Sequence, residues 1–251
     1  MLFVAVIGFA VVNSPGWDDV KQSFFNRQEF RDALPDILSG FWINVKIFLI
    51  AEVFILVFAL AVAVLRSLPG PVFFPVRALA VVYVDLFRGI PTILVIYILG
   101  FGVPALGLPG VPVDPLFWGI VSLVLVYSAY VSEVYRAGID SVHPSQAAAA
   151  RSLGLTHGQA LRFVVIPQAV RRVIPPLLND FIGLQKDTAL VALLGVVEAF
   201  RQSQIDVAGN FNYTPYIATA IIFIALTIPM ARFTDWLIAR DKRRQQAGRL
   251  A

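Results

Sequence analysis

Several ionisable side chains lie within the most apolar stretches of this sequence. Charged groups in apolar surroundings are costly, so they usually face one another or a polar cavity. A zwitterionic solute needs a cationic or amide donor for its carboxylate and an acceptor for its ammonium group, and these stretches carry both kinds of group. The candidates for a solute pathway are Glu52, Asp85, Arg88, Lys186 and Asp187, together with Gly89, Pro91 and Thr188 beside them.

The segment Asp85-Leu86-Phe87-Arg88-Gly89-Ile90-Pro91 combines charge with helix-breaking residues. Asp85 and Arg88 are three residues apart and can meet on one helix face, which lowers the cost of burying either. Pro91 removes a backbone donor and kinks a helix, and Gly89 permits close backbone approach. The segment predicts either a structural kink with an internal ion pair or part of a gate or solute site in a broken helix.

The other candidates also have two interpretations each. Lys186 and Asp187 point about 100° apart on a helix, so we expect one to face a translocation path and the other to pair within the bundle. Glu52 lies too deep in its stretch to reach an interface easily. It is therefore either a buried partner for another helix or a part of the path.

Catalytic chemistry has little support in the sequence. There is no cysteine, which excludes disulfides, thiol catalysis and Cys-based metal sites. The two histidines, His143 and His157, lie in one polar loop, and neither H-E-x-x-H nor G-x-S-x-G occurs. We therefore predict a chain that is not an enzyme and holds no metal.

Composition indicates a membrane protein. Of 251 residues, 58% are hydrophobic and 14% are charged, against about 25% charged in an ordinary soluble domain. A span takes roughly 20 apolar residues, and continuous apolar stretches favour helices over a barrel. We predict an all-α, polytopic fold with about five transmembrane helices at Phe41–Leu65, Ala78–Phe101, Leu116–Ala137, Phe181–Phe200 and Tyr216–Ile238.

The same pattern divides the chain into three parts. Residues 1–38 form a hydrophobic and amphipathic N-terminal extension, residues 39–240 the transmembrane domain, and residues 241–251 a basic tail. Lys and Arg collect in loops on the cytoplasmic side. If the first span runs outside to inside, that side holds Arg66, Arg77, Arg136, Arg151, Arg162, Arg171, Arg172 and the tail, and the outer loop 102–115 has no Lys or Arg. The basic balance therefore follows from topology and needs no nucleic acid partner.

The polar loop between the third and fourth spans predicts two short helices. Pro144 suits a first helical turn, and the alanines that follow favour a helix. Gly154 stands where a left-handed C-terminal cap would end it. Thr156 and Gln159 then form a capping box for a second helix. On these grounds alone, the loop is either an ordinary surface element or a docking element whose small side chains admit a close partner.

The loop also resembles a known family. Ala149-Ala150, three residues, Gly154, nine residues and Val164-Val165-Ile166-Pro167 are similar to the EAA loop of ATP-binding-cassette (ABC) import permeases. The surrounding text and LFRGIPTILVIYILGFG resemble the polar amino acid uptake branch, and the resemblance covers roughly residues 39–240. The sequence departs from the motif at Ala148, where the family has Glu, which removes an acceptor near the helix N-terminus.

The resemblance implies a role for the loop and a set of partners. It implies a cytoplasmic coupling helix that docks on a separate ATPase subunit, which would bind the ATP and Mg²⁺, and no cofactor on this chain. It also implies a second permease subunit, an extracytoplasmic amino-acid-binding protein, a lipid bilayer as surroundings, and the inner membrane of a prokaryote with the C-terminus in the cytoplasm. The implied coupling residues are Ser145, Gln146, Ala147, Ala148, Ala149, Ala150, Arg151, Gly154, Leu155 and Pro167.

A secondary transporter of small polar solutes, driven by an ion gradient, is the alternative. It too would carry charges inside the membrane. Five spans are few for such a transporter, and the sequence has no evident internal repeat. Glu133 and Arg136, near the inner end of the third span, are expected to contact the coupling loop under the permease interpretation.

Overall fold

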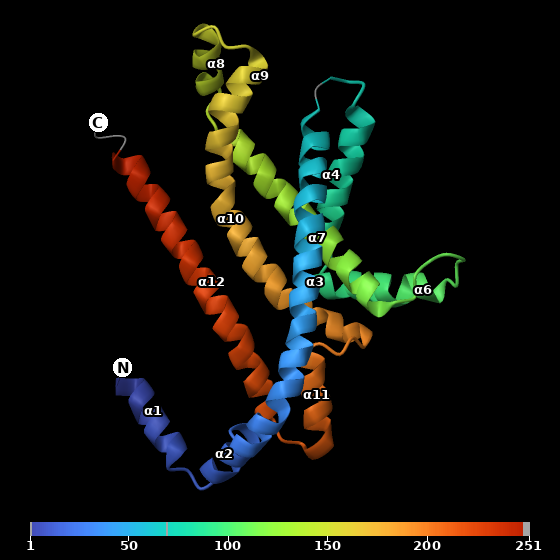
Figure 1. The fold of residues 1–251 in the computed structure, drawn as a ribbon, viewed down its shortest axis with the longest axis vertical. Helices are drawn as coiled ribbons and strands as arrows, with labels where there is room; N and C mark the ends of the chain where they lie inside the picture. Colours follow the sequence, from blue (N-terminus) through green and yellow to red (C-terminus); the bar gives the residue numbers. More distant parts are fainter. Residues whose placement is uncertain (1, 69, 248–251) are drawn as a thin grey trace.

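The computed structural model describes residues 2–68 and 70–247, and every regular element within them is a helix. This confirms the predicted all-α class. Figure 1 shows long helices that cross one another, with a pair of short helices gathered at one end of the molecule. The long helices are α3 (Arg27–Ser67), α7 (Pro115–Asp140), α10 (Ile166–Asp187) and α12 (Thr214–Ala247).

The number of membrane spans differs from the prediction. Three segments, 17–67, Pro115–Asp140 and Thr214–Arg240, are long and apolar enough to cross a membrane. Helix α4 (Phe74–Gly89) passes only together with the segment Thr92–Ala105, from which it is bent by 106°. The described residues thus hold three such spans, or four with the bent pair. The expected count of five is not confirmed.

Helix α3 is longer than the span predicted within it. Asn26 caps its N-terminus, with the side-chain oxygen accepting from the backbone N–H of Gln28 at 2.9 Å and Glu29 at 3.3 Å. Its 41 residues extend about 60 Å at 1.5 Å per residue. The N-terminal extension therefore contains α1 (Leu2–Val12), α2 (Trp17–Phe24) and the first turns of α3; Met1 lies outside the described residues.

The predicted second span is broken where the sequence indicates. Ile90 has an extended conformation, with φ −94° and ψ 132°, because the ring of a following proline disfavours the helical region. Pro91 then opens α5 (Thr92–Tyr97), which continues through the π-helix η1 (Ile98–Gly102) into α6 (Val103–Ala105). In Figure 1 this segment runs sideways from the end of α4.

Helix α7 lies at the centre of the core. It packs against α3, α4 and α10, and the main buried cluster draws on α3, α7, α10 and the segment after α10. A Cβ on Gly119 would collide with the side chain of Val191, so a glycine at this position permits close packing. Leu123, on the same helix, is fully buried in the cluster. The third predicted span is confirmed by α7.

The predicted fourth span, Phe181–Phe200, is wrong as a continuous helix. Helix α10 ends at Asp187, and a 3₁₀ helix, η3 (Thr188–Leu194), follows it. Thr188 begins the change, because its hydroxyl donates to the carbonyl of Gln185 at 2.7 Å and accepts from a side chain of α3. Gly195, at φ +86°, then turns the chain toward α11 (Ala199–Asn210).

Helix α12 contains the fifth predicted span and extends beyond it. Only 17% of its most apolar window is buried. Figure 1 shows it meeting α3 and α11 at its N-terminal end and leaning away from the bundle toward the other. It continues to Ala247 and so includes most of the predicted basic tail; residues 248–251 lie outside the described part of the chain.

Candidate functional site

The polar loop folds as the two short helices predicted. Helix α8 (Pro144–Ser152) begins at His143, whose Nδ1 accepts from the backbone N–H of Ser145 at 3.2 Å. It ends at Ser152, two residues before Gly154, which has φ +90°. The backbone N–H groups of Gly154 and Leu155 donate to the carbonyls of Arg151, at 3.0 Å, and Ala150, at 3.3 Å. The left-handed glycine therefore satisfies the carbonyls at the helix end.

A capping box starts the second helix, as the sequence predicts. The Thr156 hydroxyl accepts from the Gln159 backbone N–H at 3.3 Å, and the Gln159 side chain accepts from the Thr156 N–H at 2.9 Å. Helix α9 (His157–Ala160) then passes through the π-helix η2 (Leu161–Val165) into α10. The loop is thus joined to the bundle without a flexible linker, and Figure 1 shows it at the end of the molecule opposite α11.

Most of the predicted coupling residues lie on one exposed surface. Ala150 is buried and Ala147 packs on the small cluster of Val142, Val165 and Ala169 beneath the loop. Leu155 is half-buried, and Pro167 is exposed on α10. The exposed members on α8 and its cap are Ser145, Gln146, Ala148, Ala149, Arg151 and Gly154.

Two apolar residues on the loop surface were not predicted from the sequence. Leu153, directly before the capping glycine, is 83% exposed, and Phe163 on η2 is also largely exposed. An apolar side chain next to a left-handed glycine at the tip of a polar loop is the signal that could have found Leu153. Together with the alanines of α8, these side chains give the loop an apolar surface suited to a protein partner.

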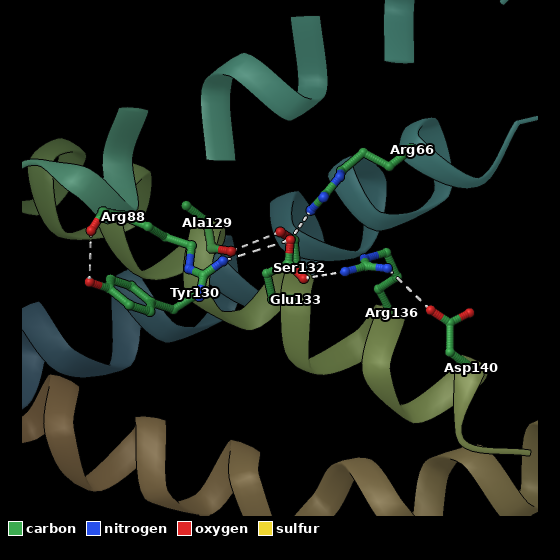
Figure 2. Close-up of polar contacts among 8 residues, drawn as sticks. All are labelled: Arg66, Arg88, Ala129, Tyr130, Ser132, Glu133, Arg136 and Asp140. Carbon is green, nitrogen blue, oxygen red and sulfur yellow. Dashed lines mark hydrogen bonds and ion pairs between the residues drawn. The ribbon is translucent and has the colours of Figure 1, made fainter. Parts of the chain in front are cut away.

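Three arginines lie around one carboxylate near the loop end of the bundle (Figure 2). Glu133 on α7 is bonded by Arg66 at the end of α3 and by Arg136 at 2.8 Å, and Arg88 at the end of α4 lies 3.9 Å away. Arg136 also pairs with Asp140 at 3.2 Å. The side chains of Arg66 and Glu133 are 11% and 19% exposed, whereas those of Arg88 and Arg136 are each 44% exposed. We call these residues the Glu133 cluster.

The Glu133 cluster replaces the internal ion pair that was one of the two interpretations of the segment Asp85–Pro91. The ion pair between Asp85 and Arg88 was wrong, because Asp85 is exposed and pairs with no described residue. Arg88 turns instead to α7, where a largely buried carboxylate attracts it, and its guanidinium carbon lies 5.7 Å from the ring centre of Tyr130. Of the two residues expected to contact the polar loop, Arg136 does so through Asp140, where the loop begins, while Glu133 bonds arginines instead. Arg66 was missed as a partner.

The structure separates the remaining pathway candidates. Asp187 accepts from the Tyr127 hydroxyl on α7 at 2.9 Å, while Lys186 is exposed. This agrees with the expectation that one of the pair faces inward. Thr188 is fully buried, and Glu52 is half-buried and close enough to Asp180 for their charges to interact. Gly89 has open space around it, so close packing does not explain it.

A second buried polar cluster joins α3 to the start of α11. Asn44 donates to the Thr188 hydroxyl at 3.1 Å and to the Glu198 carboxylate at 2.8 Å, and its oxygen accepts from the Ala199 N–H at 3.1 Å. Glu198 is fully buried and also accepts from the N–H groups of Phe200, at 3.0 Å, and Arg201, at 2.7 Å. We call Asn44, Thr188 and Glu198 the Asn44 cluster.

The sequence could not pair Glu198 with Asn44, because the two residues are 154 positions apart. An asparagine inside the first apolar stretch was the available signal. Gly40, one turn before Asn44, belongs to the same contact. A Cβ there would lie 2.8 Å from the backbone N of Ala199 and from the backbone C of Glu198.

An all-helical chain with spanning helices, charges between them and an ordered polar loop at one end has the features of the transmembrane part of a transporter. Residues 70–243 match the family described as binding-protein-dependent transport system inner membrane component. The chain is 34% identical over 197 residues to the probable amino-acid permease protein YxeN of Bacillus subtilis, covering 78% of this chain and 87% of the relative. It is 31% identical over 196 residues to the arginine transport system permease protein ArtQ of the same organism, with coverage of 78% and 87%.

A solved structure agrees with these relatives. A chain described as belonging to the crystal structure of an amino acid ABC transporter with histidines superposes with a TM-score of 0.74 at 31% identity, covering 82% of this chain and 94% of that one. The protein therefore belongs to the family of binding-protein-dependent inner membrane components, the permease subunits of ABC importers. Such subunits are generally not enzymes and work in a prokaryotic membrane with an ABC ATPase and a second permease subunit.

Proposed function

We propose that this chain forms half of the translocation path of an ABC importer for polar or charged amino acids. An external binding protein delivers the amino acid, and a partner ATPase binds the ATP and Mg²⁺. The names of the similar permeases support the cargo class. The observation that carries the coupling role is the exposed surface of α8, which small side chains and a left-handed Gly154 leave open to a partner.

The loop is placed to move two helices of the bundle together. The guanidinium of Arg172 on α10 donates to the carbonyl of Ser141, the residue after α7. Gly138 on α7 packs against Val173 on α10 so closely that a Cβ would have no room. A displacement of α8 by the ATPase therefore reaches α7 and α10 as one unit, which is the kind of two-state element that alternating access requires.

A joint displacement of α7 and α10 would also move the candidate pathway residues at the C-terminal end of α10. Asp187 is bonded to Tyr127 on α7, and Thr188 belongs to the Asn44 cluster. Lys186 directly precedes these two residues in sequence and is exposed. A shift of α10 would change the surroundings of Lys186 while its neighbours stay bound to the bundle.

The docking role can be tested at Gly154. A valine there would need a left-handed conformation that a β-branched side chain strongly disfavours. We expect Gly154→Val to reduce co-purification of the ATPase subunit at least tenfold while the chain still inserts into membranes. Gly209→Val is the control, because that glycine has open space around it and belongs to α11, the helix at the end of the molecule opposite the loop. Unchanged recovery of the ATPase with Gly154→Val would refute the docking role.

The cargo class needs its own assay. The complex purified from native membranes, with its binding protein, is placed in proteoliposomes and supplied with single amino acids while ATP hydrolysis is followed. We expect at least one polar or charged amino acid to stimulate hydrolysis and to accumulate inside. Accumulation driven by an ion gradient without ATP, or stimulation by no amino acid, would contradict the proposed function.

A further inference from the structure

Two hollows follow one another on the face made by η3, α11 and α12. The first, of about 450 Å³, is lined by Arg201, Gln204 and the aromatic side chains of Tyr97 and Phe101, among others. The second, of about 600 Å³, is lined by Lys186 together with Tyr216, Thr219 and Phe223. Phe200 lines both hollows and so separates them.

Each hollow contains one cation and no carboxylate. The residues that line the first include Arg201 as their sole charged member, and those that line the second include only Lys186. Neither forms an ion pair with a described residue, and Arg201 donates only to the side chain of Gln204, at 2.9 Å. An unpaired cation against an apolar surface is costly unless it meets water or an anion.

The acidic side chains that the structure describes on the surrounding helices lie beside other residues and do not line the two hollows. Asp187 on α10 bonds Tyr127, and Glu198 before α11 is fully buried in the Asn44 cluster. Asp206 on α11 accepts from Gln202 at 2.9 Å. Asp180 on α10 lies beside Glu52, and Asp235 on α12 lies beside Arg232. Asp187 is close enough to Lys186 for their charges to interact, but it lines neither hollow, so the lining of both hollows is positive and aromatic.

We infer that this face is the wall of the translocation path and that it selects amino acids of zero or negative net charge. The inference rests on the proposed function and specifies its cargo. The α-carboxylate binds first beside Arg201 and then beside Lys186, through charge-assisted hydrogen bonds. The faces of Phe200, Tyr216 and Phe223 accept the ammonium group by cation–π contact.

A cationic amino acid is excluded by the same groups. Its side chain would bring a second positive charge past Arg201 and Lys186, with no carboxylate on this face to bind it. Two like charges in a site of low dielectric repel strongly. Sequence similarity does not decide this point, because a relative named as an arginine permease is 31% identical to this chain. The charge of the two hollows is the distinguishing feature.

The test compares variants of one complex in proteoliposomes. ATP-driven uptake of labelled glutamate, glutamine and arginine is measured with the same binding protein throughout, so a change between variants reports on the permease. We expect the native complex to accumulate glutamate or glutamine and not arginine. Lys186→Glu should reduce uptake of the preferred amino acid by roughly tenfold or more, the effect of losing a charge-assisted hydrogen bond. Arg201→Gln tests the first hollow and should give a similar loss.

Two controls make the outcome decisive. Lys46→Gln on α3 removes a cation that lies 6.0 Å from the Trp42 ring and lines neither hollow, and it should leave uptake unchanged. Co-purification of the ATPase shows that each variant assembles. Arginine uptake equal to that of the neutral and acidic amino acids, or full uptake by assembled Lys186→Glu and Arg201→Gln, overturns the inference. Failure of every amino acid to stimulate ATP hydrolysis instead overturns the proposed function.

Discussion

The Asn44 cluster and the Glu133 cluster both tie α3 to another part of the bundle, but they do so in different ways. Glu198, in the Asn44 cluster, is fully buried and accepts only from an amide and two backbone N–H groups, at 2.7 to 3.0 Å. Glu133 is 19% exposed and lies among three arginines, one of them at 3.9 Å. One carboxylate thus has a fixed set of neutral donors, and the other has more cations than it can bind closely.

This difference indicates which contact can change during transport. Removing the partners of a buried, fully bonded carboxylate leaves several polar groups unsatisfied, so such a contact has one stable arrangement. A partly exposed carboxylate with more arginines around it than it can bind closely can exchange one arginine for another at small cost. We expect the Asn44 cluster to stay intact in every state of the permease and the Glu133 cluster, close to the coupling loop, to rearrange.

The largest loss of stability is expected from a substitution that breaks the Asn44 cluster. Glu198→Ala removes the acceptor for the N–H groups of Phe200 and Arg201 and for Asn44. We expect a loss of stability on the order of 3 kcal/mol, since each buried unpaired donor costs about 1–3 kcal/mol. Thermal unfolding of the purified complex measures it. Glu198→Gln, which keeps an oxygen for the backbone donors, should lose less than half as much, and an alanine variant as stable as the native protein would contradict the interpretation.

The next largest loss of stability is expected from a substitution that disturbs the packing beside the Asn44 cluster. Gly40→Ala places a Cβ 2.8 Å from the backbone of Ala199, which has to shift. Overpacking of this kind costs about 1–3 kcal/mol. The matched control is Gly209→Ala, a helical glycine with open space around it, which should be neutral or slightly stabilising. Equal melting temperatures for the two variants would show that the contact adapts.

A smaller effect distinguishes the arginines of the Glu133 cluster. Arg66, at 11% exposure, bonds Glu133 in largely buried surroundings, whereas Arg136, at 44%, is exposed to solvent. Arg66→Ala should cost about 2 kcal/mol and Arg136→Ala less than about 1 kcal/mol. Thermal unfolding of the two variants side by side tests this ranking, and the reverse order would show that exposure does not govern the cluster.

The smallest stability effect is expected at Arg88. At 3.9 Å and 44% exposure, its pair with Glu133 should contribute no more than about 0.5 kcal/mol. If the cluster rearranges during transport, Arg88→Ala should slow ATP-driven uptake by several-fold while ATPase co-purification stays unchanged. Equal losses of uptake and assembly would instead support a purely structural role.

Local features of the fold were predictable from the sequence, and long-range ones were not. Pro144, Gly154 and the pair of Thr156 and Gln159 act within one helical turn, so their spacing predicts α8, its cap and α9. The break at Pro91 follows from the ring of that residue alone. These elements need no information about the rest of the chain.

The errors arise where partners are far apart in sequence. Asp85 and Arg88 were compatible on one helix face, but α7 brings Glu133 to Arg88 and leaves Asp85 exposed. The fourth apolar stretch is typical of one continuous span. In the structure, α10 is followed by a 3₁₀ helix at Thr188, which is bonded to Asn44 from 144 residues away. Pairings of this kind depend on tertiary packing that periodicity does not encode.

Because little of α12 is buried in this chain, we expect the stability of the chain to depend on how much of its partner subunit is present. With 17% of its most apolar window buried, this helix contributes little to the chain's own core and leaves a long apolar surface for a second subunit or lipid. A partner that binds only the folded chain stabilises it by mass action. We expect the amount of intact protein in a cell to follow the amount of its partner subunit, with unassembled copies degraded first.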